Sequence, residues 1–123
     1  MKFILDTNFL LIPGQFKVDI FSELRKFGRL ELYTLDLSVK ELEKLSLEKS
    51  FDGMAAKLAL GLVKEKGIHV LAAGRGSTDT EIEAAAIFGS YTVCTQDKDL
   101  IGRLKTKGIK IISLRQKKYL VEV

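Results

Sequence analysis

Short runs of apolar and β-branched residues alternate with apolar residues at helical spacing along the whole chain. A short apolar run between turn residues predicts a buried strand, and a repeat of three or four residues predicts an amphipathic helix. Five strands are expected on this basis, over residues 2–5, 32–35, 68–72, 91–95 and 109–113. Strands that alternate with helices are typical of a parallel sheet with crossover helices.

The helical segments lie between these strands. The spacing predicts helices over residues 16–27, 38–45, 52–66, 78–89 and 99–107. Two of them should begin with capping boxes, because Ser38 with Glu41 and Thr78 with Glu81 have the required spacing. We therefore expect residues 1–123 to form a single α/β domain, in which helices flank a central parallel sheet of about five strands and a basic tail follows.

Composition agrees with one small folded unit. The chain has 123 residues, of which 46% are hydrophobic and 29% charged, so it can bury a real core. A single cysteine, Cys94, cannot form an internal disulfide, and this predicts a reducing cytoplasm. The sequence has no segment typical of a secretion signal and no apolar stretch long enough to span a bilayer. We therefore expect no association with a membrane.

The excess of positive charge is unevenly distributed. The net charge is +4, and the stretch from Lys98 to Lys118 holds eight basic residues and one acid, Asp99. This asymmetry fits a polyanionic partner. It fits equally well a set of lysines that solvate a final helix and tail. Charge alone leaves both interpretations open.

Acidic residues follow the predicted strands repeatedly. Asp6 comes directly after the first strand, and Asp97 follows the fourth. Glu41 and Asp79 lie in the first turns of the helices after the second and third strands. The carboxyl ends of parallel strands share one edge of a sheet, which is where such folds bind ligands. We therefore expect these four carboxylates to lie within reach of a shared ion.

Carboxylates that converge repel one another unless a cation lies between them. Ligands that are all oxygen suit Mg²⁺ or Mn²⁺ better than Zn²⁺. A divalent metal held in this way assists hydrolysis of a phosphodiester. Each acid also has a structural explanation, as a turn residue (Asp6), a capping-box partner (Glu41), a complement to a helix dipole (Asp79) or a helix cap (Asp97 or Asp99).

Other chemistries find little support in the sequence. His69 is the only histidine and lies within a predicted strand, so it is expected to be structural and a nuclease built on paired histidines is excluded. The chain has no Walker sequence. The loop Gly74-Arg75-Gly76 lacks the third glycine of a dinucleotide-binding fingerprint.

Four segments, taken in order, resemble the acidic motifs of PIN-domain ribonucleases. They are Asp6-Thr7-Asn8, Ser38-Val39-Lys40-Glu41-Leu42, Thr78-Asp79-Thr80-Glu81-Ile82 and Thr95-Gln96-Asp97-Lys98-Asp99-Leu100. The resemblance implies that Asp6, Glu41, Asp79 and Asp97 are catalytic acids that bind Mg²⁺ or Mn²⁺, with Asp99 as an auxiliary acid.

The same resemblance implies supporting roles for other polar side chains. Thr7, Asn8 and Thr95 would orient the carboxylates or water, although turn chemistry at strand ends also explains them. The basic residues expected to contact the RNA backbone are Arg75, Lys98, Arg103 and Lys105.

Within the family, the closing stretch from Ile111 to Leu120 is more similar to the branch that processes small-subunit ribosomal RNA than to VapC-type toxins. The zinc-binding cysteines often found in that branch are absent here. The function expected from the resemblance is therefore a metal-dependent endoribonuclease of ribosomal RNA processing. A toxin ribonuclease of a toxin–antitoxin pair and a catalytically silent RNA-binding or assembly module are the alternatives. The expected partners are structured RNA, a second copy in a homodimer, and an antitoxin or a ribosome-assembly protein.

Overall fold

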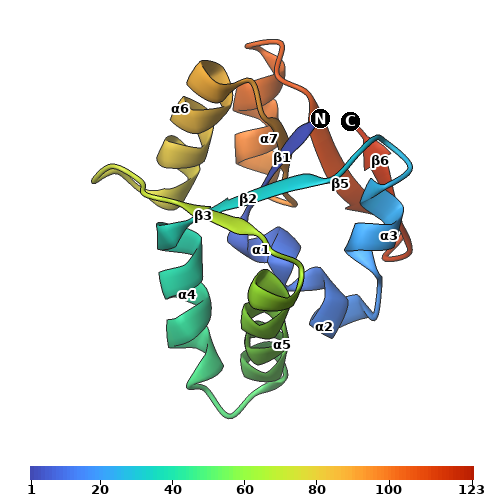
Figure 1. The fold of residues 1–123 in the computed structure, drawn as a ribbon, viewed down its shortest axis with the longest axis vertical. Helices are drawn as coiled ribbons and strands as arrows, with labels where there is room; N and C mark the ends of the chain where they lie inside the picture. Colours follow the sequence, from blue (N-terminus) through green and yellow to red (C-terminus); the bar gives the residue numbers. More distant parts are fainter.

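A six-stranded sheet runs through the middle of the computed structural model, which describes residues 1–123 (Figure 1). The strands are β1 (Lys2–Leu5), β2 (Glu31–Leu35), β3 (His69–Leu71), β4 (Thr92–Cys94), β5 (Ile111–Arg115) and β6 (Tyr119–Glu122). Their order across the sheet is β3-β2-β1-β4-β5-β6. All neighbouring pairs are parallel except β5 and β6. The α/β class and the five parallel strands predicted from the sequence are confirmed.

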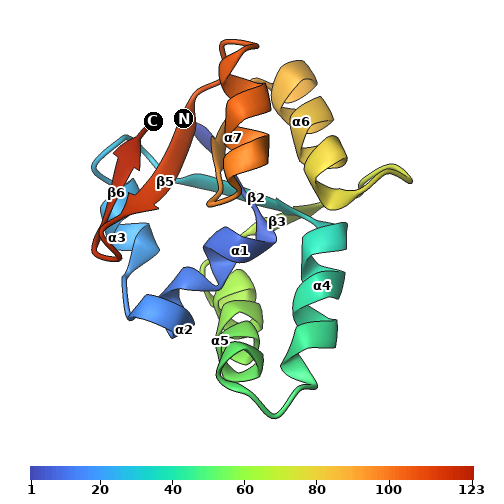
Figure 2. The same ribbon diagram turned by 180° about the vertical axis from the view of Figure 1, so that it is seen from behind.

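Seven helices cover the two faces of this sheet. They are α1 (Thr7–Leu10), α2 (Ile12–Phe16), α3 (Ile20–Leu24), α4 (Asp36–Ser46), α5 (Phe51–Glu65), α6 (Thr78–Gly89) and α7 (Lys98–Lys105). Helices α6 and α7 lie together on one side, and α4 and α5 lie on the other with α1 and α2 beside them (Figures 1 and 2). None of the helices combines the length and the apolar character needed to cross a membrane.

The central strand β1 separates two apolar cores. Phe3 and Leu5 belong to the larger core, which includes residues of α1 to α5, whereas Ile4 belongs to the smaller core under α6 and α7. Successive side chains of a strand point to opposite faces, and all three of these residues are fully buried. After Lys2, which is only partly buried, this strand has no polar residue on either face, as a sheet covered on both sides requires.

The predicted helix over residues 16–27 is wrong. Within this range only Phe16, the last residue of α2, and residues 20–24 of α3 are helical, and the helical spacing of Phe16 and Ile20 spans the break between the two helices. Lys17 ends α2 in the left-handed conformation, with φ of 55°. Asp19 then starts α3, because its carboxylate accepts hydrogen bonds from the backbone N–H groups of Phe21 and Ser22, both at 3.1 Å.

The basic tail expected after residue 113 is in fact a β-hairpin. Strand β5 extends to Arg115, and β6 returns antiparallel to it, with Leu114 opposite Leu120. Gln116 and Lys117 form the turn with φ of 54° and 55°. The turn was not predicted because it contains none of the glycine or asparagine residues that usually adopt such angles.

Neither predicted capping box forms. Helix α4 begins at Asp36, so Ser38 lies inside it, where its buried hydroxyl has no hydrogen-bond partner. Helix α6 is capped at Ser77 and not at Thr78. Glu41 is consequently not used as a cap and remains available for other contacts.

Candidate active site

All four acids named from the sequence line one pocket of about 580 Å³. It lies where β1 and β4 end, between α1, α4, α6 and α7. Its lining residues are Asp6, Thr7, Asn8, Leu11, Glu41, Leu45, Ser77, Thr78, Asp79 and Asp97. The sheet therefore brings together residues that are up to 91 positions apart, as expected for loops at the carboxyl edge of parallel strands.

Asp6 is the most deeply placed of these acids, with only 6% of its surface exposed. Its Oδ1 accepts a hydrogen bond from the backbone N–H of Thr7 at 2.8 Å. Its Oδ2 accepts from the hydroxyl of Thr95 at 2.7 Å and from the side-chain amide of Asn8 at 3.2 Å. Three donors thus fix this carboxylate, and the backbone N–H of Asp6 donates to the carbonyl oxygen of Cys94.

Burial raises the pKa of Asp6 above its ordinary value. The hydrogen bonds from Thr95 and Thr7 oppose this effect, and the negative charges of Glu41 and Asp97 add to it. A buried carboxylate beside two other acids is the environment in which a bound cation relieves both desolvation and repulsion. The electrostatics of Asp6 therefore favour a positively charged ligand.

Thr95 links Asp6 to the neighbouring acidic loop. Its fully buried hydroxyl donates to Asp6 and accepts a hydrogen bond from the backbone N–H of Asp97 at 3.1 Å. Asn8 makes a second link, because its Oδ1 accepts from the backbone N–H of Gln96 at 3.0 Å. The loops after β1 and β4 are therefore held in one arrangement by side chains.

Asp97 combines a structural role with a place in the pocket. Its Oδ1 caps α7 by accepting from the backbone N–H groups of Asp99 and Leu100, at 3.0 and 3.2 Å. The cap uses this oxygen alone, which leaves Oδ2 free of hydrogen bonds within the chain. The helix-cap explanation considered for this residue is correct, and it is compatible with a second use of the carboxylate.

Glu41 reaches the same pocket from α4. The hydroxyl of Thr7 donates a hydrogen bond to Glu41 Oε1. Thr7 follows Asp6 directly, so its backbone contacts one acid and its side chain contacts another. Glu41 is therefore held at the start of α1, next to the end of β1.

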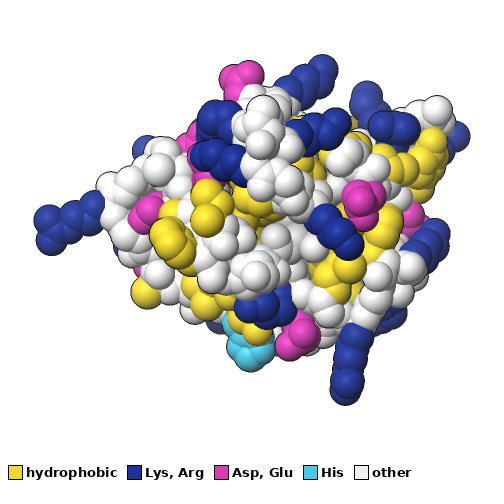
Figure 3. Space-filling view, turned by 90° about the horizontal axis from the view of Figure 1, so that it is seen from above, with side chains coloured by type: hydrophobic (Ala, Val, Ile, Leu, Met, Phe, Trp, Pro, Cys, Tyr) yellow, Lys and Arg dark blue, Asp and Glu magenta, His cyan; other side chains and the backbone are white.

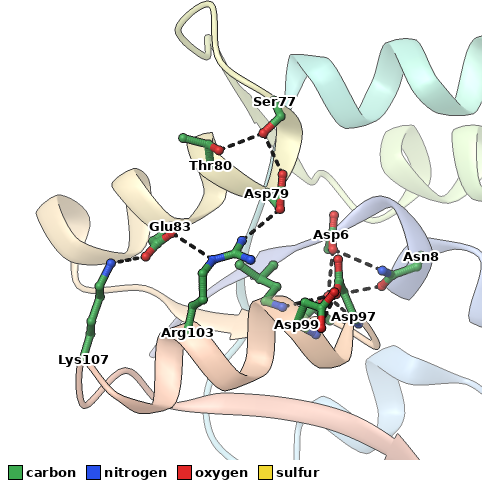
Figure 4. A network of polar contacts seen from close by, with 12 residues as sticks. Asp6, Asn8, Ser77, Asp79, Thr80, Glu83, Asp97, Asp99, Arg103 and Lys107 are labelled. Carbon is green, nitrogen blue, oxygen red and sulfur yellow. Dashed lines mark hydrogen bonds and ion pairs between the residues drawn. The ribbon is translucent and has the colours of Figure 1, made fainter.

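Asp79 lies on the α6 side of the pocket and is held there by contacts of its own (Figure 4). Its Oδ1 accepts from the hydroxyl of Ser77 at 2.7 Å, and its Oδ2 forms an ion pair with Arg103 at 2.9 Å. Arg103 also lies 3.5 Å from Glu83, which pairs with Lys107. The contacts from Ser77 and Arg103 lower the pKa of Asp79.

The four acids line one pocket, but no group of three or more acids, histidines or cysteines in the structure is arranged to hold one ion. The expectation that all four carboxylates already lie within reach of a shared ion is therefore wrong for this conformation. The hydrogen bonds account for the difference. Asp79 is held by Ser77 and Arg103, and Glu41 is held by Thr7.

The remaining residues named from the sequence lie outside the pocket lining. Asp99 is exposed in the first turn of α7, next to Asp97 (Figure 4). Arg75, Lys98 and Lys105 are exposed and make no ion pair. Arg103, which was expected to contact RNA, instead uses its guanidinium to bind Asp79 and Glu83.

Positive charge is not confined to the edge that carries the acids. Lys and Arg side chains are also scattered over the end of the molecule that carries both termini (Figure 3). The distribution of charge therefore does not by itself mark a single binding surface.

Sequence reasoning missed two residues that shape the site. Ser77 was not singled out, yet it lines the pocket and binds Asp79. Gln96 was not singled out, although its side chain accepts hydrogen bonds from Ser113 Oγ at 2.7 Å and the backbone N–H of Leu114 at 2.6 Å. The contacts of Gln96 depend on β4 and β5 being neighbours in the sheet, which the sequence pattern does not specify.

The sequence of residues 3–117 matches the family model described as a PIN like domain. The chain belongs to this family. PIN domains are typically nucleases that use divalent metals, which fits the oxygen-only character of the pocket. None of the curated proteins matches the sequence.

Solved structures support the assignment to the PIN family. The chain is similar to a structure described as the PIN domain endonuclease Utp24, with 27% identity and a TM-score of 0.81 over 98% of this chain and 90% of that one. A domain of a functionally unknown protein from Methanocaldococcus jannaschii has the same fold, with 22% identity and a TM-score of 0.63 over 99% and 96% of the two chains.

The ion pair between Arg103 and Asp79 yields a testable prediction. Arg103→Gln should raise the affinity of the pocket for Mn²⁺ by roughly two- to fivefold, because a cation would no longer compete with an exposed guanidinium for Asp79. Titration calorimetry with Mn²⁺ measures this change. Lys107→Gln is the matched control, since it removes a cation from Glu83 and leaves Asp79 untouched. An affinity that falls in Arg103→Gln would contradict the competition.

Proposed function

We propose that this PIN domain is a metal-dependent endoribonuclease. The observation that carries the proposal is the pocket in which Asp6, Glu41, Asp79 and Asp97 meet at the carboxyl edge of the sheet. Similarity over nearly the whole chain to a PIN domain endonuclease supports the same reaction.

The residues of the pocket fit a hard divalent cation. Its acidic ligands are all carboxylates, which suits Mg²⁺ or Mn²⁺, and no cysteine or histidine lines it. Because no three of these side chains are arranged around one point in this structure, Asp6, Glu41 and Asp97 would hold the ion only after Glu41 shifts from its contact with Thr7, and Asp79 would join after release from Arg103. A cation bound there would supply neutralisation of phosphate charge and would lower the pKa of an attacking water.

The chain itself would orient the reacting groups. Thr95 and Asn8 fix the carboxylate of Asp6 in one orientation. Thr7 holds Glu41 across the pocket. Rigid placement of this kind lowers the barrier, because the groups need not be ordered during the reaction.

We further propose that the substrate is structured ribosomal RNA and that the enzyme cleaves it during RNA processing in the cytoplasm. The support is the resemblance of the stretch from Ile111 to Leu120 to the branch that processes small-subunit ribosomal RNA and, for the compartment, the single buried and free thiol of Cys94. Arg75, Lys98 and Lys105 are exposed and unpaired, and we propose them as contacts to the phosphate backbone. A toxin ribonuclease would use the same pocket and chemistry.

Incubation of the purified chain with structured ribosomal RNA fragments tests the proposal. We expect internal cleavage that requires Mn²⁺ or Mg²⁺ and stops when a chelator is added. Glu48→Gln removes an exposed acid outside the pocket and should cleave like the wild type. The proposal is wrong if Mn²⁺ produces no cleavage of ribosomal fragments or of unstructured RNA.

A further inference from the structure

A second pocket, of about 370 Å³, lies between the start of α3 and the turn that joins β5 to β6. Three lysines line it, namely Lys17, Lys117 and Lys118, together with the aromatic ring of Phe16. None of these four residues belongs to the acidic motifs, and the proposed nuclease chemistry uses none of them.

The lysines of this pocket have no acidic partner. The chain has four side-chain ion pairs between acids and bases and one at its amino terminus, and none of them involves these lysines. The two acids that also line the pocket are already engaged. Asp19 caps α3, and Glu23 pairs with Lys26 and accepts a hydrogen bond from the backbone N–H of Leu120 at 3.1 Å. The pocket is therefore electropositive and open to an anion.

Two of the lysines are held in an unfavourable backbone conformation. Lys17 and Lys117 both have φ of 55°, in the left-handed region where glycine is the usual residue. A side chain with a Cβ is disfavoured there, because the Cβ lies too close to the following carbonyl oxygen. Residues that keep such a conformation are concentrated at ligand-binding sites, and here two of them face the same pocket.

Phe16 adds a surface on which a base can stack. It lies at the end of α2 with 36% of its surface exposed, and Lys117 Nζ is 5.7 Å from the centre of its ring. An exposed aromatic ring beside unpaired lysines is the combination that binds single-stranded nucleic acid, since the ring stacks a base and the cations contact phosphates.

Short segments of the chain connect this pocket to the acidic one. Leu11 lines the acidic pocket and lies five residues before Phe16, which corresponds to about 8 Å along a helix. On the other side, Gln96 donates its backbone N–H to Asn8 and holds Leu114 through its side chain. One strand of RNA could therefore contact both pockets.

We propose that the pocket formed by Phe16, Lys17, Lys117 and Lys118 binds one nucleotide of a single-stranded RNA segment beside the bond to be cleaved. The lysines contact its phosphate, and Phe16 stacks its base. This inference rests on the proposed ribonuclease function for the identity of the substrate. It adds a substrate-binding site that the acidic residues do not provide.

Binding measured without cleavage tests this site separately from the chemistry. Fluorescence anisotropy with a labelled single-stranded RNA, in chelator and at several salt concentrations, gives the affinity and its salt dependence. Each lysine contact contributes about 0.7 to the slope of log affinity against log salt for a single strand. Lys17→Gln with Lys117→Gln should therefore weaken binding roughly twentyfold at 0.1 M salt and lower the slope by about 1.4.

Lys110→Gln is the charge-matched control. Lys110 is exposed just before β5, whereas Lys117 follows that strand, so the control lies at the opposite end of it. Because Lys110→Gln removes one charge and the double variant removes two, each single variant, Lys17→Gln and Lys117→Gln, is compared with it directly. We expect the affinity of Lys110→Gln to equal that of the wild type. Weakening in Lys110→Gln equal to that in each single variant would show nonspecific charge and would overturn the proposal.

Phe16→Leu tests stacking, because it keeps an apolar side chain and removes the ring. We expect about tenfold weaker binding to single-stranded RNA and no change for duplex RNA. Equal binding of Phe16→Leu and wild type to the single strand would overturn the stacking contact. If the wild type fails to cleave RNA but the lysine effects persist, the nuclease proposal fails and the binding site stands. If the wild type cleaves RNA and the double variant binds RNA as tightly as the wild type, the nuclease proposal stands and the binding site fails.

Discussion

Asp6→Asn should reduce Mn²⁺-dependent RNA cleavage by more than about a hundredfold, since even residues that only support a metal ligand typically contribute about 10- to 100-fold. Asp6 is the most buried acid of the pocket and the one that three hydrogen-bond donors hold in place. Asparagine has nearly the same shape, so the substitution removes charge without opening a cavity. Single-turnover cleavage of an end-labelled RNA measures the loss.

The same variant should be as stable as the wild type, or more stable, when no metal is present. The folded pKa of Asp6 is raised above its ordinary value of 3.8, mainly by burial. A raised pKa means that the protonated acid stabilises the fold at low pH, and this stabilisation is lost as the pH rises through the folded pKa. The difference in free energy of unfolding between Asp6→Asn and wild type should therefore increase in favour of the variant above about pH 4.

Urea unfolding in chelator at a series of pH values measures this difference. The free energy of unfolding of the wild type is subtracted from that of the variant at each pH. This is necessary because Asp79 and Glu83 have lowered pKa values, and their protonation destabilises both proteins as the pH falls. Glu48→Gln is the control, because it removes an exposed acid that lies outside the pocket. Cleavage by Asp6→Asn at the wild-type rate would rule out Asp6 as a metal ligand.

Asp97 gives the second large effect, and two variants separate its roles. Asp97→Asn keeps a good helix cap, so the backbone N–H groups of Asp99 and Leu100 retain an acceptor. Asp97→Ala removes the cap and should lower stability by about 1 kcal/mol. Both should lose cleavage by more than about a hundredfold, because neither leaves a carboxylate in the pocket.

Thermal unfolding and cleavage assays on both variants test this separation. Loss of cleavage in Asp97→Asn with unchanged apo stability would assign the effect to the missing charge. Active Asp97→Asn with inactive Asp97→Ala would instead mean that Asp97 acts only by capping α7. That result would remove this residue from the proposed set of ligands.

The sequence was sufficient to predict the five parallel strands and the edge at which the acids gather, but not β6. Apolar runs such as residues 3–5 indicate burial on both faces of a strand, and the alternation of strands with helices predicts parallel pairing. The order of the acids along the chain then placed Asp6 and Asp97 at the ends of β1 and β4. These strands are hydrogen-bonded neighbours in the structure.

Local rules failed where tertiary contacts decide the conformation. Ser38 has the spacing of a cap, but β2 leads directly into α4 and buries it. The break at Lys17 requires a left-handed residue that is not glycine, and no helical periodicity reports it. Arg103 resembled a contact to RNA, but the packing of α6 beside α7 pairs it with Asp79. Side-chain partners across elements are not encoded in spacing along one element.

Titration of the chelator-treated protein with Mn²⁺ tests the central claim most directly, because it asks whether the acidic pocket binds a divalent cation at all. We predict saturable binding to the wild type, accompanied by a rise in melting temperature that depends on Mn²⁺ concentration. Binding and stabilisation should both be lost in Asp6→Asn and retained in Glu48→Gln. Equal Mn²⁺ binding by wild type and Asp6→Asn, or none by either, would contradict the account.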